Sequence, residues 1–301
     1  MRLLDRMLSQ GFGVNPKHAG SLADYLLTVL KDAQLVVVDN VAKYYFSNKI
    51  SDNVLKVSDF PCVMTPFEHT FMEFKMPHEY KQQTNMEEVG MLMFVTDDIE
   101  KYLENFPEIM NQEGVKYCLV SDIFIRQIGW ANASLVVTSV LPIGVDGQII
   151  SPNKDFIYGY NTLLVDGFDS ESEKNYLQGM YLNAFFPVLL GLSFMHCRNV
   201  KTEEKGPVRQ QSRAHKRKTG RPLLRYHVLV IDHMKEVLER EGHVSKKGLK
   251  KALHICRGHF ATYGMDGKGL LFGKHKGRIW VPMHTRGSAE QGIVVKDYDV
   301  K

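Results

Sequence analysis

Histidines, arginines and lysines gather near the carboxyl end of the chain, where they could move protons and hold phosphate. Ten of them fall between positions 225 and 286: Arg225, His227, His254, Arg257, His259, Lys274, His275, Arg278, His284 and Arg286. Histidine exchanges protons near neutral pH, while arginine and lysine bind phosphate and stabilise the added negative charge of a phosphoryl transition state. Metal-free cleavage of RNA needs a base, an acid and cations around the phosphate. The residue types suffice for that reaction, and equally for a surface that only binds nucleic acid or for histidines bonded within a small core.

Catalytic roles are predicted for His254, Arg257, His259 and His284, with His259 or His284 as general base or acid and Arg257 or Arg286 on the phosphate. His254 and Arg257 share a face if their segment is helical. Gly258 favours an early end to that helix, which leaves His259 either in the site or bonded to the exposed carbonyls of the helix end. Nucleic-acid contacts are predicted for Arg225, His227, Lys268, Lys274, Lys276, Arg278 and Arg286.

The same region predicts neither a metal site nor a cofactor. Its histidines and Cys256 have neither Cys-x-x-Cys nor His-Glu-x-x-His spacing. The glycine-rich segment 264–273 carries Lys268 but lacks the patterns of phosphate-binding loops. It is interpreted as a flexible hairpin or lid-like loop.

Opposed charges divide the chain. Residues 201–301 hold 23 Lys plus Arg against 10 Asp plus Glu, and the preceding 200 residues hold 15 against 24. The balances are +13 and −9, hidden in an overall charge of +4. A basic segment of this kind favours a polyanionic partner, because phosphate neutralisation supplies most sequence-independent affinity for nucleic acid.

The length of 301 residues and the charge division predict two α+β domains. The expected order is an acidic domain of residues 1–200 with a mixed or antiparallel sheet, a flexible cationic linker at 201–222, and a basic β-α-β-β domain at 223–301. The linker is almost without apolar residues and contains Arg213, His215, Lys216, Arg217, Lys218 and Arg221.

Periodicity places the elements within these domains. Helices are expected at 16–33, from Asp97 through Phe106, from about Ser170 to Met195, and from Ser245 to about Tyr263. Strands are expected at 71–74, 91–95, 117–126, 134–141, 225–231, 278–284 and 293–300. Glu73 and Asp122 fall in strand-like runs and could be metal-ligand carboxylates, although a lone carboxylate on a strand usually faces solvent.

Cellular location is predicted from cysteines and hydropathy. The four cysteines are far apart, and the first ten residues carry charges where a secretory signal would be apolar. The longest apolar run, 184–195, contains Pro187 and is shorter than the roughly 20 residues of a membrane span. We therefore expect a reduced, cytoplasmic protein without a membrane partner, and a buried helix at 184–195.

Several strings occur in a characteristic order: Gly191-Leu-Ser-Phe-Met-His-Cys-Arg-Asn-Val200, Gly220-Arg-Pro-Leu-Leu-Arg-Tyr-His-Val-Leu229, Arg257-Gly-His-Phe260, Leu271-Phe-Gly273, and Ile279-Trp280-Val281 followed by Arg286-Gly287. Together they resemble a group of uncharacterised proteins of tailed phages and bacteria, over roughly residues 191–300. That resemblance implies a phage or mobile-element origin, hence the host cytoplasm, and transfers no activity. Members of the group often carry a further basic residue where this chain has Ala261.

Three functions follow as hypotheses. The leading one is a phage-type protein that binds DNA or RNA through the basic carboxyl-terminal domain. The second is a metal-independent, toxin-like ribonuclease in the same domain, masked by the acidic half through opposed charge. The third is a host-takeover factor that binds a bacterial protein.

Overall fold

A computed structural model describes residues 1–14, 21–47, 60–104, 106–151, 160–161, 179, 181–197, 199–231, 252–256, 259–264, 269–270, 276–281, 284–286 and 288–293. The chain divides into two compact units, one of residues 1–195 with 202–229 and one of residues 196–201 with 230–301. Helices and strands are both abundant, and the class is α+β.

An eight-stranded mixed sheet forms the framework of the first unit, in the order β6-β5-β4-β3-β2-β1-β8-β7. Its strands are β1 (Gln34–Val37), β2 (Thr70–Lys75), β3 (Met86–Thr96), β4 (Tyr117–Gln127), β5 (Ser134–Ile143), β6 (Tyr160–Asn161), β7 (Val200–Lys205) and β8 (Tyr226–Ile231). Strand β1 runs parallel to both β2 and β8, whereas β2 to β6 are antiparallel neighbours. The strands expected at 71–74, 91–95, 117–126, 134–141 and 225–231 are confirmed.

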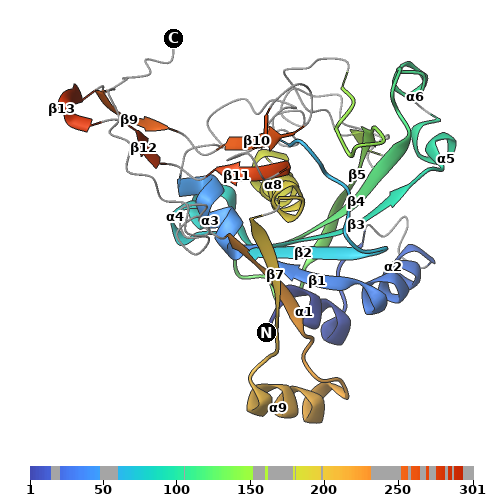
Figure 1. Ribbon diagram of the computed structural model, residues 1–301. Helices are drawn as coiled ribbons and strands as arrows, with labels where there is room; N and C mark the ends of the chain where they lie inside the picture. Colours follow the sequence, from blue (N-terminus) through green and yellow to red (C-terminus); the bar gives the residue numbers. More distant parts are fainter. Residues whose placement is uncertain are drawn as a thin grey trace. The chain divides into compact units, whose positions relative to one another are not determined.

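Helices cover both faces of this sheet (Figure 1). The described helices of this unit are α1 (Leu3–Gln10), α2 (Ser21–Asp32), α3 (Asp39–Ser47), α4 (His78–Thr84), α5 (Ile99–Leu103), α6 (Pro107–Met110), the π-helical turn η4 (Tyr181–Phe185), α8 (Phe186–Met195) and α9 (Arg209–Thr219). Helices α1 and α2 lie on one face, and α3 and α8 on the other (Figure 1).

Helix α8 is apolar all round because it is enclosed. Nine of its ten residues are buried, as expected for a core helix. A Cβ on Gly191 would lie 2.9 Å from Met72 Cε and 3.2 Å from Val38 Cγ1, so glycine lets α8 approach β2 closely. Among the described helices, none has the length and apolar character needed to cross a membrane.

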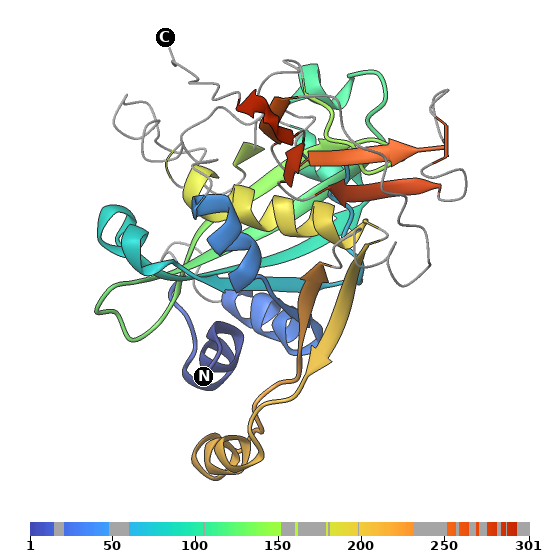
Figure 2. The same cartoon turned by 60° about the vertical axis from the view of Figure 1, so that its left-hand side comes forward.

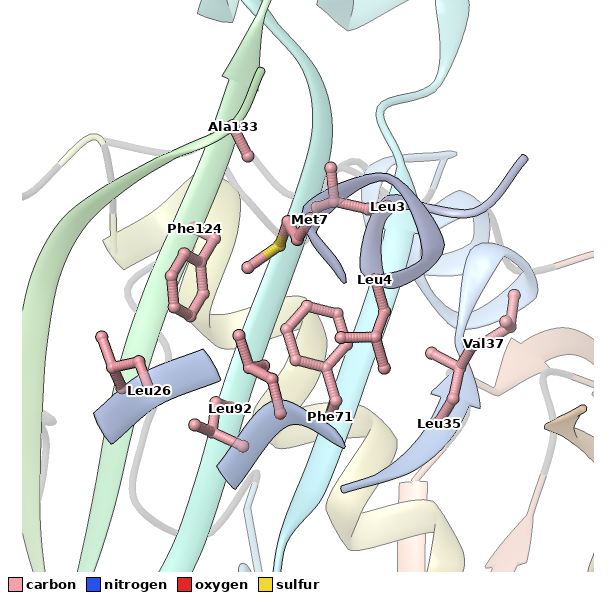
Figure 3. Close-up of a cluster of buried hydrophobic side chains, with 11 residues drawn as sticks. Leu3, Leu4, Met7, Leu26, Leu35, Val37, Phe71, Leu92, Phe124 and Ala133 are labelled. Atoms are coloured by element: carbon pink, nitrogen blue, oxygen red, sulfur yellow. The ribbon is translucent and has the colours of Figure 1, made fainter. Parts of the chain in front are cut away.

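The opposite face is sealed by a buried cluster that joins α1 and α2 to the strands (Figure 3). Its members are Leu3, Leu4, Met7, Leu26, Leu30, Leu35, Val37, Phe71, Leu92, Phe124 and Ala133. Each large side chain so buried contributes roughly 1.5–3 kcal/mol. Helix α1 was not predicted, yet it supplies three members of the cluster.

A carboxylate from the sheet caps helix α1. The N–H of Leu4 donates to Glu73 Oε2 over 2.9 Å, and Arg2 Nε lies 3.9 Å from Glu73 Oε1. Arg2 Nη1 also pairs with Asp39 Oδ2 at 2.9 Å, and Asp39 Oδ1 accepts the Lys75 N–H at 2.8 Å. The first N–H groups of a helix lack internal partners, so Glu73 supplies from β2 what α1 cannot supply itself.

A second ionic cluster lies between Arg6 of α1 and charged residues of β3 and β4. Arg126 Nε donates to Glu88 Oε2 at 2.7 Å and Arg126 Nη1 pairs with Glu87 at 2.6 Å, while Arg6 Nε is 4.0 Å from Glu88. The Arg126 hydrogen bond lowers the pKa of Glu87. Buried charges tolerate desolvation only when paired in this way.

The expectation that Glu73 and Asp122 face solvent is wrong. Glu73 is 3 % exposed, and burial raises its pKa to about 7 against the hydrogen bonds and the Arg2 charge. Asp122 is 7 % exposed and accepts a hydrogen bond from Thr138 Oγ1, and burial raises its pKa to about 6. Helix α1 covers Glu73, and Thr138 of the neighbouring strand bonds to Asp122, which a strand pattern alone does not reveal.

Three further expectations are corrected. Residues 201–222 do not form a flexible linker, because they contain β7 and α9, and β8 joins the large sheet through β1. The expected helix from Asp97 is capped by Asp98, and it is split into α5 and α6 at Pro107. The helix expected from Ser245 to about Tyr263 is wrong over its described part, which forms strands β9 and β10.

The second unit contains short strands: β9 (Ala252–Cys256), β10 (His259–Tyr263), β11 (Gly277–Val281), β12 (His284–Arg286) and β13 (Ser288–Ile293). Strands β10 and β11 form one antiparallel pair, and β9 lies between β12 and β13. Asn199 exchanges two side-chain hydrogen bonds with the Trp280 backbone at 2.7 and 2.9 Å. The indole of Trp280 is 5 % exposed and packs on Phe260 as a core side chain.

Replacing Gly90 by Ala is expected to destabilise the first unit by about 1–3 kcal/mol, through overpacking. A Cβ there would collide with the ring of Phe71 and lie 2.9 Å from Leu3 Cδ2, where α1 crosses β3. Urea unfolding measures the loss. Gly206→Ala is the control, since a Cβ there meets nothing within 4 Å. Equal stability of the two variants would contradict close packing of α1.

Stability should fall as pH rises through the range in which Glu73 ionises. Its pKa is raised from 4.5 to about 7, so between these values the folded protein holds a proton that the unfolded chain releases, and stability is lost as pH increases. In Glu73→Gln, the loss of unfolding free energy between pH 5 and pH 8 should shrink by about 2 kcal/mol.

The control for this measurement is Glu100→Gln, which removes an exposed carboxylate from α5. It should keep the pH dependence of the parent protein, including the part that Asp122 contributes with the same sign. The assignment fails if Glu73→Gln and Glu100→Gln lose equal stability between pH 5 and pH 8.

Candidate nucleic-acid interface

The segment 202–229 forms an arm in which β7 and β8 carry helix α9 away from the sheet (Figures 1 and 2). Its return strand is fixed to the sheet interior. His227 and Val228 pair with Val36 and Val37 of β1, and Asn40 Nδ2 donates to the Leu229 carbonyl at 2.8 Å. The arm therefore starts from rigid structure.

Helix α1 holds the base of the arm. The Leu224 N–H donates to Asp5 Oδ1 over 2.9 Å, and Leu224 and Tyr226 pack against the buried cluster. The guanidinium of Arg2 lies over the Tyr226 ring, 4.9 Å from its centroid. Burial raises the pKa of Asp5, while the Leu224 hydrogen bond and the charge of His215 favour the ionised form.

Local chemistry sets the ends of α9. It begins after Val208 and ends at Gly220, whose positive φ of 78° suits glycine and whose N–H bonds to the Lys216 carbonyl at 2.9 Å. The chain then turns back, and the Leu223 N–H donates to Ser212 Oγ at 3.1 Å. Lys216, Arg217 and Lys218 occupy the last turn, where the helix dipole favours cations.

The two faces of α9 differ in their surroundings. Ser212 and His215 are half-buried, and a groove of about 540 Å³ separates this side from α1. The groove is lined by Met1, Ser9, Gln10, Gln211, Ala214, His215, Lys218, Thr219 and Leu223. Spacings of three and four residues place Arg209, Arg213, Lys216 and Arg217 together on the other side. We call these four residues the cationic face.

The cationic face is electrostatically uncompensated. Its four side chains are exposed, and none of them forms an ion pair with an acidic residue in the described part of the chain. No Asp or Glu occurs between Lys205 and Arg225. Like charges four residues apart destabilise a helix by a few tenths of a kcal/mol per pair. A bound polyanion would relieve this repulsion.

The predicted nucleic-acid contacts have diverse surroundings. Arg225 is ion-paired with Glu204, and the His227 ring stacks on Phe67 with centroids 5.6 Å apart. Lys276 is exposed. Arg278 is half-buried, and its Nε has no hydrogen-bond partner among the described residues. Arg225 and His227 thus belong to the first unit. The other predicted contacts lie further along the sequence and belong to the second unit.

Three predicted residues occupy neighbouring register positions on adjacent strands of the second unit. Arg286 is the register partner of His254, and His284 is the partner of Cys256, across the β9 and β12 pair. His259 pairs with Val281 in the separate β10 and β11 ladder, so it is not at a helix end. Arg257, Lys268, Lys274 and His275 lie outside the described residues.

The sequence shows the charge cluster of this region but predicts a linker there. The signal that could have revealed it is the spacing of Arg209, Arg213 and Arg217, closed by Gly220. Within the described ranges, no group of three His, Cys, Asp or Glu side chains is placed to hold a metal ion.

No protein-family model, curated protein or solved structure matches this chain.

Proposed function

We propose that this protein binds nucleic acid through the cationic face of α9. The observation that carries the proposal is an exposed helix with four uncompensated cations on one face, held on two strands of the main sheet. Arginine and lysine side chains on such a face suit phosphate groups, which supply the sequence-independent part of binding. The ligand is DNA or RNA.

The chemistry of α9 favours a nucleic acid over a lipid surface. Helices that lie in a membrane interface bury an apolar face. The groove side of α9 instead presents Gln211, His215 and Lys218, and the helix has no buried residue. A helix of 11 residues is about 16 Å long, so it fits along a nucleic-acid backbone or within a major groove.

The main contact with nucleic acid is then made by the arm, and not by the carboxyl-terminal unit as the sequence predicts. Arg225 is already paired with Glu204, so it offers less to a ligand than the cationic face does. Additional contacts by Lys276, Arg278 and Arg286 stay a prediction.

The double variant Arg213→Gln, Arg217→Gln should weaken binding of a labelled oligonucleotide, measured by fluorescence anisotropy over a range of salt. Each lost phosphate contact lowers the slope of log affinity against log salt by about 1, so the expected reduction is about 2. Glutamine retains helix propensity, and the urea midpoint should not change.

The matched control is Lys31→Gln, Lys116→Gln, which removes two exposed cations from α2 and the start of the β4 hairpin region. It changes net charge equally and should keep the salt slope of the parent. Equal slopes in the two double variants would refute a specific role for α9.

A second candidate, metal-independent ribonuclease activity, is supported by the register that pairs Arg286 with His254 beside His284. The full chain should then cleave RNA in the presence of a chelator. His284→Ala should lower the rate by about 100-fold or more, as loss of a general acid or base does. His78→Ala, an exposed histidine on α4, is the control. Cleavage that persists in His284→Ala would exclude this assignment.

A further inference from the structure

An exposed tryptophan marks a second feature of the first unit, away from the chemistry of α9. Trp130 lies in the turn between β4 and β5 and is 56 % exposed, the largest of the exposed apolar side chains that the structure describes. No described aromatic ring packs on its indole. An indole left in water at a hairpin turn has its flat face open to a ligand.

Buried charge fixes the turn that carries Trp130. Arg126 Nη1 donates to the Trp130 carbonyl at 3.1 Å, and the same guanidinium is held by Glu87 and Glu88 at 2.6 and 2.7 Å. The Trp130 N–H bonds to the Gln127 carbonyl at 3.1 Å. The turn is therefore pre-organised, which reduces the entropy lost when a ligand binds.

Beside this turn lies a pocket of about 260 Å³. Trp130, Met86, Ile125 and Val136 are its apolar lining residues, and Asn85 and Gln127 are among its polar ones. Asn85 stands at the end of α4 with a positive φ of 54°, and its carbonyl accepts the Ile128 N–H at 3.4 Å. The turn after α4 and the turn between β4 and β5 are thus joined by a hydrogen bond beside this small, partly polar pocket.

We infer that this pocket receives a single unpaired nucleobase. Its volume is below the roughly 300 Å³ at which pockets for drug-sized ligands begin, so it suits one planar ring system and excludes a base pair. Aromatic side chains stack on bases of single strands, and Asn or Gln amides pair with the donor and acceptor edges of a base. A pocket lined by an indole, aliphatic side chains, an asparagine and a glutamine has the residue types for that combination.

This inference rests on the proposed function, since it names single-stranded segments as the form of nucleic acid that is bound. The pocket can be tested by itself, because an uncharged nucleoside has no phosphate for α9 to bind. The chain contains two tryptophans, Trp130 and Trp280, so Trp280→Phe leaves Trp130 as the only indole fluorophore.

Titrating adenosine, guanosine, cytidine and uridine into full-length Trp280→Phe should quench Trp130 fluorescence with saturation. Adding Val136→Phe fills the pocket and should abolish saturable quenching, while Val145→Phe, on a residue 67 % exposed elsewhere, should leave it intact. Linear quenching by all four nucleosides, or saturation that survives Val136→Phe, would overturn the pocket.

The link to nucleic acid is tested with oligonucleotides on the otherwise unchanged protein. Trp130→Ala should weaken single-stranded binding by about 5- to 100-fold, the effect of losing one stacked base, and leave duplex binding unchanged. Unchanged single-strand affinity in both Trp130→Ala and Val136→Phe overturns the inference.

Failure of the proposed function has a different signature. Arg213→Gln, Arg217→Gln should keep nucleoside quenching while losing oligonucleotide affinity. A parent protein that binds nucleosides but no oligonucleotide would refute nucleic-acid binding and leave only a nucleoside pocket, whereas oligonucleotide binding without nucleoside quenching refutes the pocket alone.

Discussion

The bond between the Glu73 carboxylate and the start of α1 is the constraint on which the rest of the first unit depends. A carboxylate that is almost fully buried is tolerated because it accepts the Leu4 N–H and lies near Arg2. Once α1 is docked, Asp5 in the same first turn can accept the Leu224 N–H at the base of the arm. The position of α9 is thus set through α1 by a residue of β2. The contact joins residues 69 positions apart in sequence.

The same kinds of side chain have two different roles in this molecule, and their surroundings distinguish them. Arg2 and Arg126 are largely shielded from solvent, and each forms ion pairs with carboxylates, so their charges are neutralised within the fold. Arg209, Arg213 and Arg217 stand exposed on a helix whose own sequence offers no acid. Charge composition alone would count these residues as equal. Only pairing separates arginines that hold the structure together from arginines that remain available to a ligand.

Sequence patterns predicted local structure well where a short stretch of sequence is enough to determine the helix or strand. The apolar or β-branched runs of β2 to β5 and the apolar run of α8 each follow from a short window, and each is confirmed. The burial of Glu73 could not be predicted, because the helix that covers it, α1, precedes it by about seventy residues in the sequence. The helix expected over 245–263 failed because Leu253, Cys256 and Phe260 fit a helical spacing, while the strands on either side of Gly258 take their partners from far downstream. For the candidate site, the sequence shows the charges of α9 plainly. Its helical form has no hydrophobic periodicity to reveal it, and only the spacing of the arginines and Gly220 indicates a helix.

Affinity and selectivity would then arise from different parts of one unit. Contacts to phosphate position a nucleic acid but carry no information about its bases. A cationic face alone would therefore hold duplexes and single strands alike. A rigid turn that carries an exposed indole beside Asn85 and Gln127 would add a preference for nucleic acid with unpaired bases. A base within a duplex is stacked and paired, so its ring face and its pairing edge are not available. The carboxylates that fix Arg126, and through it the Trp130 turn, make this second requirement geometrically strict. Selectivity for unpaired bases is on this view a consequence of the buried charges, and binding strength a consequence of the exposed ones.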